Sequence, residues 1–165
     1  MTKKTKAEIC EHVRQFRERC AVYGLLDANG VPDLPRVYEY LPYIWSGWSF
    51  IPKEHGDMGN RLGATSPGKK LIALRNDVYE GMCQGEKEHL YTAAHELGHM
   101  VMHEELVLAR WETCHPNEKI DEEMEVEAEA DAFATELLGF QSPANQHALR
   151  LVREWVPKML KRLKP

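Results

Sequence analysis

The sequence lacks a hydrophobic run long enough to cross a membrane. A spanning helix needs about 20 consecutive apolar residues, and no stretch of this 165-residue chain approaches that length. The opening residues, MTKKTKAEIC, are basic and then polar, so they also lack the apolar core of a secretory signal peptide. We therefore expect a cytoplasmic protein that does not associate with membranes.

Closely spaced cysteine pairs are absent as well. None of the four cysteines forms a CxxC pair, which is the spacing found in many zinc and redox motifs. In a reducing cytosol we expect them to be free thiols. This pattern argues against a purely structural zinc site with four protein ligands. The cysteines are Cys10, Cys20, Cys83 and Cys114.

Positive charge is not in excess either. The net charge of −5 argues against a general nucleic-acid binder, so we expect no direct binding of nucleic acid. The charges are unevenly spread, with an acidic stretch at residues 118–136 and a basic stretch at residues 148–165. We interpret both stretches as helices with solvated faces. With 43% hydrophobic and 28% charged residues in 19.0 kDa, the composition is that of one globular domain over residues 1–165.

The spacing of apolar residues predicts an α+β fold, with a small antiparallel sheet packed beside several helices. One helix is expected at residues 6–23, and a second is expected to end at Pro42. The following stretch is rich in Gly, Pro, Trp and Ser and holds short apolar runs typical of strands. The expected parts are N-terminal helices at residues 1–42, the sheet at 43–76, two helices carrying the candidate site at 86–140, and a basic C-terminal helix at 143–165.

The strongest chemical signal is the segment His95-Glu96-Leu97-Gly98-His99. On a helix, two histidines four residues apart lie on one face, where both can bind one metal ion. Glu96 is rotated about 100° from His95, so it can act as general base on a water held by that ion without binding the ion itself. The flanking residues 90–94 and 100–102 are largely apolar. Ionisable residues buried in such a helix need a partner, and a metal ion provides one.

A catalytic zinc ion has three protein ligands and one open position, so a third ligand must come from elsewhere. His103 lies about 12 Å from His95 along the helix axis, and we expect it to support the site rather than bind the ion. The acidic helix offers Glu127 and Asp131 on one face, where one carboxylate can bind the ion and the other can hold a histidine ring. Glu129 on another face is the competing ligand, and Glu127 is favoured.

These residues resemble the ImmA/IrrE family of bacterial and phage metallopeptidases. That family shows HELGH, a further histidine four residues on, and then ExxAN-x-FA-xx-LL-MP. The corresponding strings here are HELGHMVMH at residues 95–103 and EAEADAFATELL at residues 127–138. The resemblance covers roughly residues 70–140. The chain departs from the pattern with Asp131 in place of Asn and Gly139-Phe140 in place of Met-Pro, and we find no room for the helix-turn-helix domain of many relatives.

The resemblance implies a gluzincin-like, and so zincin-like, α+β fold. It implies zinc at His95, His99 and Glu127, with Glu96 as general base. Members of the family are generally thought to cleave repressor proteins that control a mobile element or a stress response. We therefore expect a zinc-dependent endopeptidase acting on a specific protein partner, with a transcriptional repressor as the leading candidate. The alternative is a non-catalytic, metallopeptidase-like regulator that binds a protein partner, although such a module has no need of Glu96.

Two further parts of the site are expected with less detail. The strand Leu71-Ile72-Ala73-Leu74 is predicted to be exposed and to hold the substrate as an added β-strand. Donors to the developing oxyanion would be Tyr91 or His115, and both residues are also consistent with structural roles.

Overall fold

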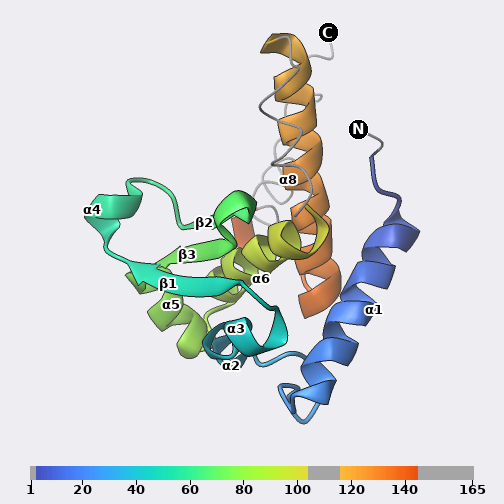
Figure 1. Ribbon diagram of the computed structural model, residues 1–165, viewed down its shortest axis with the longest axis vertical. Coiled ribbons are helices and arrows are strands. Elements are labelled where there is room, and N and C mark those ends of the chain that lie inside the picture. The colour runs from blue at the N-terminus through green and yellow to red at the C-terminus, as the bar shows by residue number, and fades with distance from the viewer. Residues whose placement is uncertain (1–2, 104–115, 145–165) are drawn as a thin grey trace, which may run out of the picture.

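The computed structural model describes residues 3–103 and 116–144 (Figure 1). Residues 145–165 of the expected C-terminal helix lie outside this part of the chain. Helix α1 (Lys6–Val22) begins at a capping box, in which the Thr5 hydroxyl accepts from the Glu8 backbone N–H and the Glu8 carboxylate accepts from the Thr5 backbone N–H. Its apolar residues recur every three or four positions and are buried, as the sequence predicted: Ile9, Val13, Phe16 and Cys20.

The second expected helix is two short helices, α2 (Leu34–Glu39) and α3 (Leu41–Ile44). Pro42 was expected to end a helix, and that prediction is wrong because Pro42 lies in the first turn of α3. A proline has no N–H to donate, and the first turn of a helix requires no donor. Helix α2 ends earlier, at Glu39, and the Tyr38 carbonyl accepts a backbone hydrogen bond at the C-terminal cap.

The sheet has three strands, β1 (Ser49–Lys53), β2 (Gly63–Ser66) and β3 (Leu71–Arg75), in the order β1-β3-β2. It is mixed, whereas a wholly antiparallel sheet was expected. The short 3-10 turn η1 (Pro67–Lys69) folds β3 back antiparallel to β2. Before that turn the chain reverses once through α4 (His55–Met58), so β1 and β3 run parallel.

The central position of β3 corrects one prediction about substrate binding. Its backbone is paired with β1 on one side and with β2 on the other, so residues Leu71–Leu74 have no free edge to receive an added strand. Ile72 and Leu74 are fully buried in the core. The strands at the two edges are β1 and β2.

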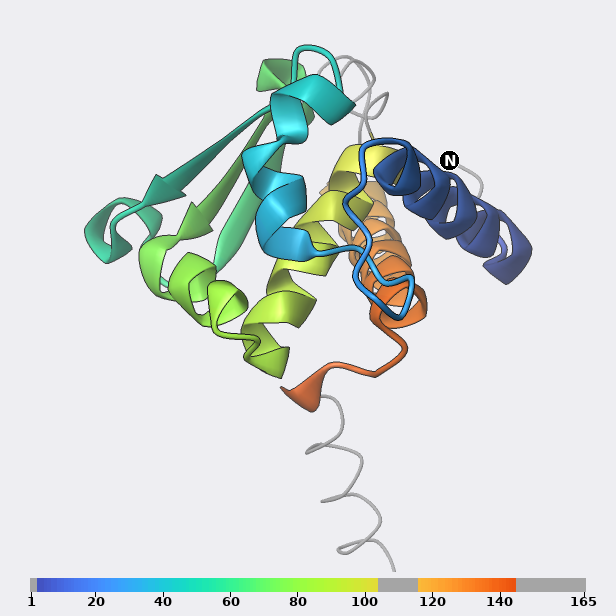
Figure 2. The ribbon, with the colours of Figure 1, turned by 90° about the horizontal axis from the view of Figure 1, so that it is seen from below.

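The remaining helices stack in layers on one face of the sheet. Helix α5 (Asn76–Cys83), which was not predicted, leads into α6 (Lys87–Met102), and α8 (Pro116–Leu138) follows. Figure 2 shows α6 between the sheet on one side and α8 with α1 on the other. The α+β architecture is therefore confirmed. None of the helices in the described ranges is both long and apolar enough to cross a membrane.

Small residues allow α6 and α8 to approach closely. A Cβ atom built on Gly98 would lie 3.2 Å from the Ala130 Cα and from Phe133. Gly98, which directly precedes His99, is therefore in tight contact with α8. The Phe133 ring meets Phe16 of α1 edge to face, with centroids 5.8 Å apart. These contacts set the distance and register between the two helices that carry the site.

Candidate metal centre

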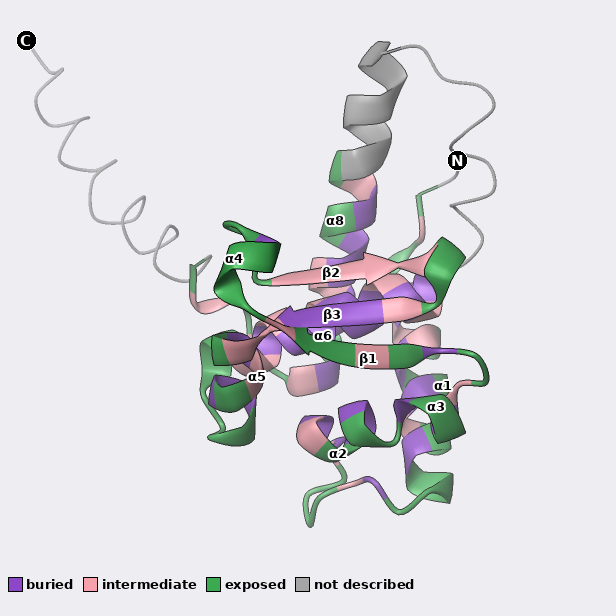
Figure 3. Cartoon of the chain, turned by 60° about the vertical axis from the view of Figure 1, so that its left-hand side comes forward, coloured by how far each residue is buried: buried purple, intermediate pink, exposed green. Residues whose placement is uncertain are grey.

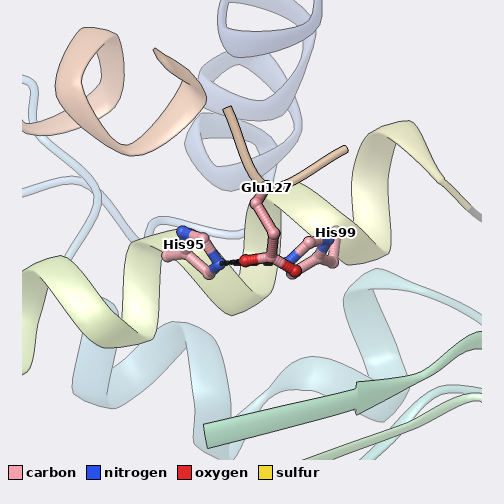
Figure 4. A group of neighbouring side chains, drawn as sticks. All are labelled: His95, His99 and Glu127. Atoms are coloured by element: carbon pink, nitrogen blue, oxygen red, sulfur yellow. Dashed lines mark hydrogen bonds and ion pairs between the residues drawn. The ribbon is translucent and has the colours of Figure 1, made fainter. Parts of the chain in front are cut away.

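Three side chains from two helices converge on one point (Figure 4). His95 and His99 project from α6 and are one helical turn apart, and Glu127 extends toward them from α8. The two Nε2 atoms are 3.0 Å apart. The Glu127 carboxylate lies 3.1 Å from Nε2 of His95 and 3.4 Å from Nε2 of His99. Among the described residues, these three form the group whose ligand atoms can share one metal ion.

The spacing of these atoms can be compared with what a zinc ion requires. Zinc is bound by histidine nitrogen and carboxylate oxygen at about 2.0–2.2 Å in tetrahedral geometry, which places neighbouring ligand atoms about 3.3–3.6 Å apart. The separations of 3.0–3.4 Å approach this range without any change in backbone. Glu127 is 62% exposed, so the ligand group can be approached from solvent.

Asp131 holds the first histidine by its other ring nitrogen. Nδ1 of His95 lies 2.9 Å from Oδ1 of Asp131, one turn beyond Glu127 on α8. An ionised carboxylate only accepts hydrogen bonds, so Nδ1 carries the proton and Nε2 is left as the metal-binding nitrogen. Burial lowers the pKa of His95, but its hydrogen bonds to Asp131 and Glu127 outweigh burial and raise the pKa to about 9 in the metal-free protein.

A longer chain of contacts holds the second histidine. Nδ1 of His99 lies 3.1 Å from Nδ1 of His103, and Nε2 of His103 lies 3.0 Å from Glu129. Because Glu129 can only accept, His103 donates to it through Nε2, and its bare Nδ1 then accepts from Nδ1–H of His99. That arrangement leaves Nε2 of His99 free for a metal. The structure thus places Glu129, the competing ligand in the sequence analysis, behind His103 and away from the ligand group.

The buried pair of His103 and Glu129 connects to the N-terminal segment. The two side chains are 3% and 2% exposed, and Glu129 also accepts from the Lys4 backbone N–H at 2.7 Å. Burial lowers the pKa of His103 to about 4, against the effect of Glu129. Burial raises the pKa of Glu129, but the bonds from Lys4 and His103 outweigh it and keep that pKa below its usual value. The pair is therefore a neutral imidazole on a carboxylate.

Glu96 lies beside the ligand group and against the edge strand β2. It is 7% exposed, and its Oε2 accepts from the Thr65 hydroxyl at 2.6 Å. A Cβ atom on Gly63 would lie 2.6 Å from Oε1 of Glu96, so only glycine leaves room for the carboxylate. Burial raises the pKa of Glu96, and the bond from Thr65 offsets part of that increase. A buried carboxylate with a raised pKa beside a metal site is suited to accepting a proton.

Comparison with known proteins identifies the family. A family model described as the IrrE N-terminal-like domain of peptidase family M78 matches residues 56–138, half of the chain. The chain belongs to this family. Searches of curated proteins and of solved structures gave no match.

Membership of the IrrE N-terminal-like family makes the chain metallopeptidase-like and implies a metal site. The matched range contains β2, β3, both candidate histidines and Glu127. The donor set observed here, two imidazoles and a carboxylate with an open side, is the type that catalytic zinc sites use. The family and the geometry therefore both indicate a metal site, and the three candidate ligands lie within the matched range.

The sequence analysis did not identify some residues of this site, and it assigned others to positions that the structure does not support. Thr65 and Gly63 had no signal in the sequence, since nothing separates them from the other small residues of that stretch. Tyr91 points toward α8, where its hydroxyl bonds to the Asp131 carbonyl at 3.0 Å, so it is not directed at the ligand group as an oxyanion donor. His115 lies outside the described residues.

Proposed function

We propose that the protein is a zinc-dependent endopeptidase that cleaves a specific protein partner. The observation that carries this proposal is the convergence of His95, His99 and Glu127 on one point, with Glu96 held beside it. A bound zinc ion would polarise the carbonyl of the scissile bond and make water at the site more acidic. The family match supports a peptidase rather than another use of these residues.

The chain's own residues account for the remaining steps. Glu96, ionised and held by Thr65, accepts a proton from the attacking water and can pass it to the departing amine. Asp131 and His103 fix the tautomers of the two histidines before any substrate binds. Because these groups are buried or held by hydrogen bonds, little reorganisation is needed during the reaction.

The substrate is proposed to bind along β2 rather than β3. Among the described residues, β2 pairs only with β3, so its outer edge is open to an added strand. Thr65 of this strand touches Glu96, so a peptide paired with β2 passes the general base. The proposed partner is a transcriptional repressor of a mobile element or stress response, and its support is the resemblance to the ImmA/IrrE family.

The first test is metal content followed by turnover. We expect about one zinc per chain in the purified protein, and loss of that zinc in His99→Ala. With zinc loaded, the protein should hydrolyse peptides of a proteome-derived library, and Glu96→Gln should retain zinc while losing hydrolysis. Glu136→Gln, an exposed position on α8, is the matched control.

Two results would redirect the proposal. Hydrolysis that persists in Glu96→Gln would contradict the role of Glu96. One zinc per chain without hydrolysis of any peptide would favour the alternative, a regulator that binds its partner without turnover. The identity of the substrate as a repressor is tested separately. The active protein is added to an extract of the cells from which it comes, and the new N-termini of cleaved proteins are sequenced. Cleavage confined to proteins that bind no DNA would contradict that part.

A further inference from the structure

The pairing of the strands determines which side chains lie on the sheet face away from α6. Paired residues point to the same face of a sheet. Ile51, Ala73 and Ala64 are paired across the three strands, and they lie on the outer face. Their neighbours Phe50, Ile72 and Thr65 lie on the inner face, toward α6. Figure 3 shows this outer face, with α4 at one end of it.

A pocket of about 430 Å³ opens on this outer face. Its floor is formed by small or apolar residues of β2 and β3, with Met58 of α4 beside them. Three cationic side chains surround it, from Lys53, Arg61 and Lys69, against one acidic residue, Asp57. Within the described ranges, none of these three cations has an ion-pair or hydrogen-bond partner for its side chain. The whole chain carries a net charge of −5, so this concentration of positive charge is local.

The strand β2 lies between this pocket and the general base. Ala64 and Ser66 line the pocket on the outer face, while Gly63 and Thr65 contact Glu96 on the inner face. The side chains of an added strand alternate between the same two faces. A peptide on the edge of β2 therefore presents every second side chain to the side of the pocket, and the residues between them to the side of the metal centre.

We infer that this pocket selects substrates with acidic side chains at alternate positions around the scissile bond. The inference rests on the proposed function, because it uses the peptide path along β2. Unpaired cations attract carboxylates, and the small side chains of Ala64 and Ser66 leave room for a glutamate to lean over them. Asp57 on the rim and the net negative charge of the protein disfavour a nucleic-acid backbone as the occupant.

The test measures binding without turnover. Zinc-loaded Glu96→Gln protein is titrated, with fluorescence anisotropy as readout, into two labelled seven-residue peptide pools. One pool carries Glu at the second, fourth and sixth positions with uncharged residues between, and the other carries Gln there. We expect the Glu pool to bind more tightly, by about two- to fivefold for each acidic side chain that reaches the pocket. The difference should shrink as salt is added.

Matched variants assign the preference to the pocket. In the Glu96→Gln background, Arg61→Gln with Lys69→Gln removes two exposed cations of the pocket. Lys6→Gln with Lys87→Gln removes two exposed cations elsewhere. We expect the first pair to abolish the preference for Glu and the second to retain it. Equal binding of the two pools, no binding of either, or a preference that survives in Arg61→Gln with Lys69→Gln would overturn the inference.

Two further readouts separate this inference from the proposed function and from other occupants. Cleavage of peptides by the active protein with no preference for Glu overturns the inference and leaves the peptidase standing. Selective binding of the Glu pool without any cleavage supports the inference and counts against turnover. A 20-base-pair DNA duplex that binds more tightly than the Glu pool and displaces it would show that the pocket serves nucleic acid, and would overturn the inference.

Discussion

Replacing Glu129 with glutamine should weaken metal binding although Glu129 touches no metal ligand. The carboxylate accepts from three donors, the Lys4 backbone N–H at 2.7 Å, Nε2 of His103 at 3.0 Å and the Lys4 ammonium at 3.4 Å. Glutamine has one accepting oxygen and one NH₂ group, so in either orientation it directs a donor at a donor. If His103 changes tautomer to avoid this conflict, its Nδ1 becomes a donor facing His99. His99 must then place its proton on Nε2, the nitrogen that a metal needs.

The magnitude of this effect follows from burial. One buried donor without a partner costs about 1–3 kcal/mol, and losing the outer partner of a metal-binding histidine typically lowers affinity about 10- to 100-fold. At 1.4 kcal/mol for each factor of ten, these two ranges agree. We therefore expect Glu129→Gln to bind zinc at least tenfold more weakly. Asp131→Asn should show a loss of similar size, because Asp131 holds His95 in the same way.

Competition against a chromophoric zinc chelator measures these affinities directly. Glu136→Gln on the exposed side of α8 removes the same charge from the same helix and should bind zinc like the unaltered protein. If Glu129→Gln and Glu136→Gln bind zinc equally within a factor of two, the argument that proton placement passes from Glu129 to His99 is refuted.

Three other predictions follow from the same structure. Gly63→Ala should lower kcat/KM at least tenfold with zinc content unchanged, because a Cβ atom there would lie 2.6 Å from Oε1 of Glu96; full activity would contradict the placement of Glu96. Gly98→Ala should lower the free energy of unfolding by about 1–3 kcal/mol in urea titrations, since its Cβ would meet α8 at 3.2 Å, and an unchanged midpoint would show that the helices can separate. The metal-free protein should lose stability as the pH rises from about 6.5 to about 9. The reason is that folding raises the pKa of His95 to about 9, so protonation of His95 stabilises the fold fully only below the pKa of the unfolded state. A urea midpoint that does not change over this pH range would contradict that shift.

Local helix geometry is the reason that the sequence could predict which of these side chains lie side by side. Spacings of four residues put His95 beside His99 and Glu127 beside Asp131, whatever the rest of the chain does. The rotation of about 100° per residue likewise separates Glu129 from Glu127, and the structure places them in different networks. Such inferences need only the helix, and the helix was clear from its apolar pattern.

The parts that failed depend on which segments meet. The four apolar residues at 71–74 form a continuous run without alternation, which is typical of a strand buried on both faces, and that signal argued against an exposed β3. Other contacts had no signal at all. Thr65 and Glu96 are 31 residues apart in the chain, and Lys4 and Glu129 are 125 apart. No periodic pattern reports on pairs of that kind.

The contact between Lys4 and Glu129 has a practical consequence for anyone who purifies this protein. The backbone amide of Lys4 closes the series of hydrogen bonds that ends at His99, so the first turn before α1 takes part in holding the site. An affinity tag fused directly ahead of residues 3–5 would change metal occupancy as well as solubility. Trimming these residues from the protein would have the same effect. Protein for zinc measurements is therefore better tagged at a position distant from residues 3–5.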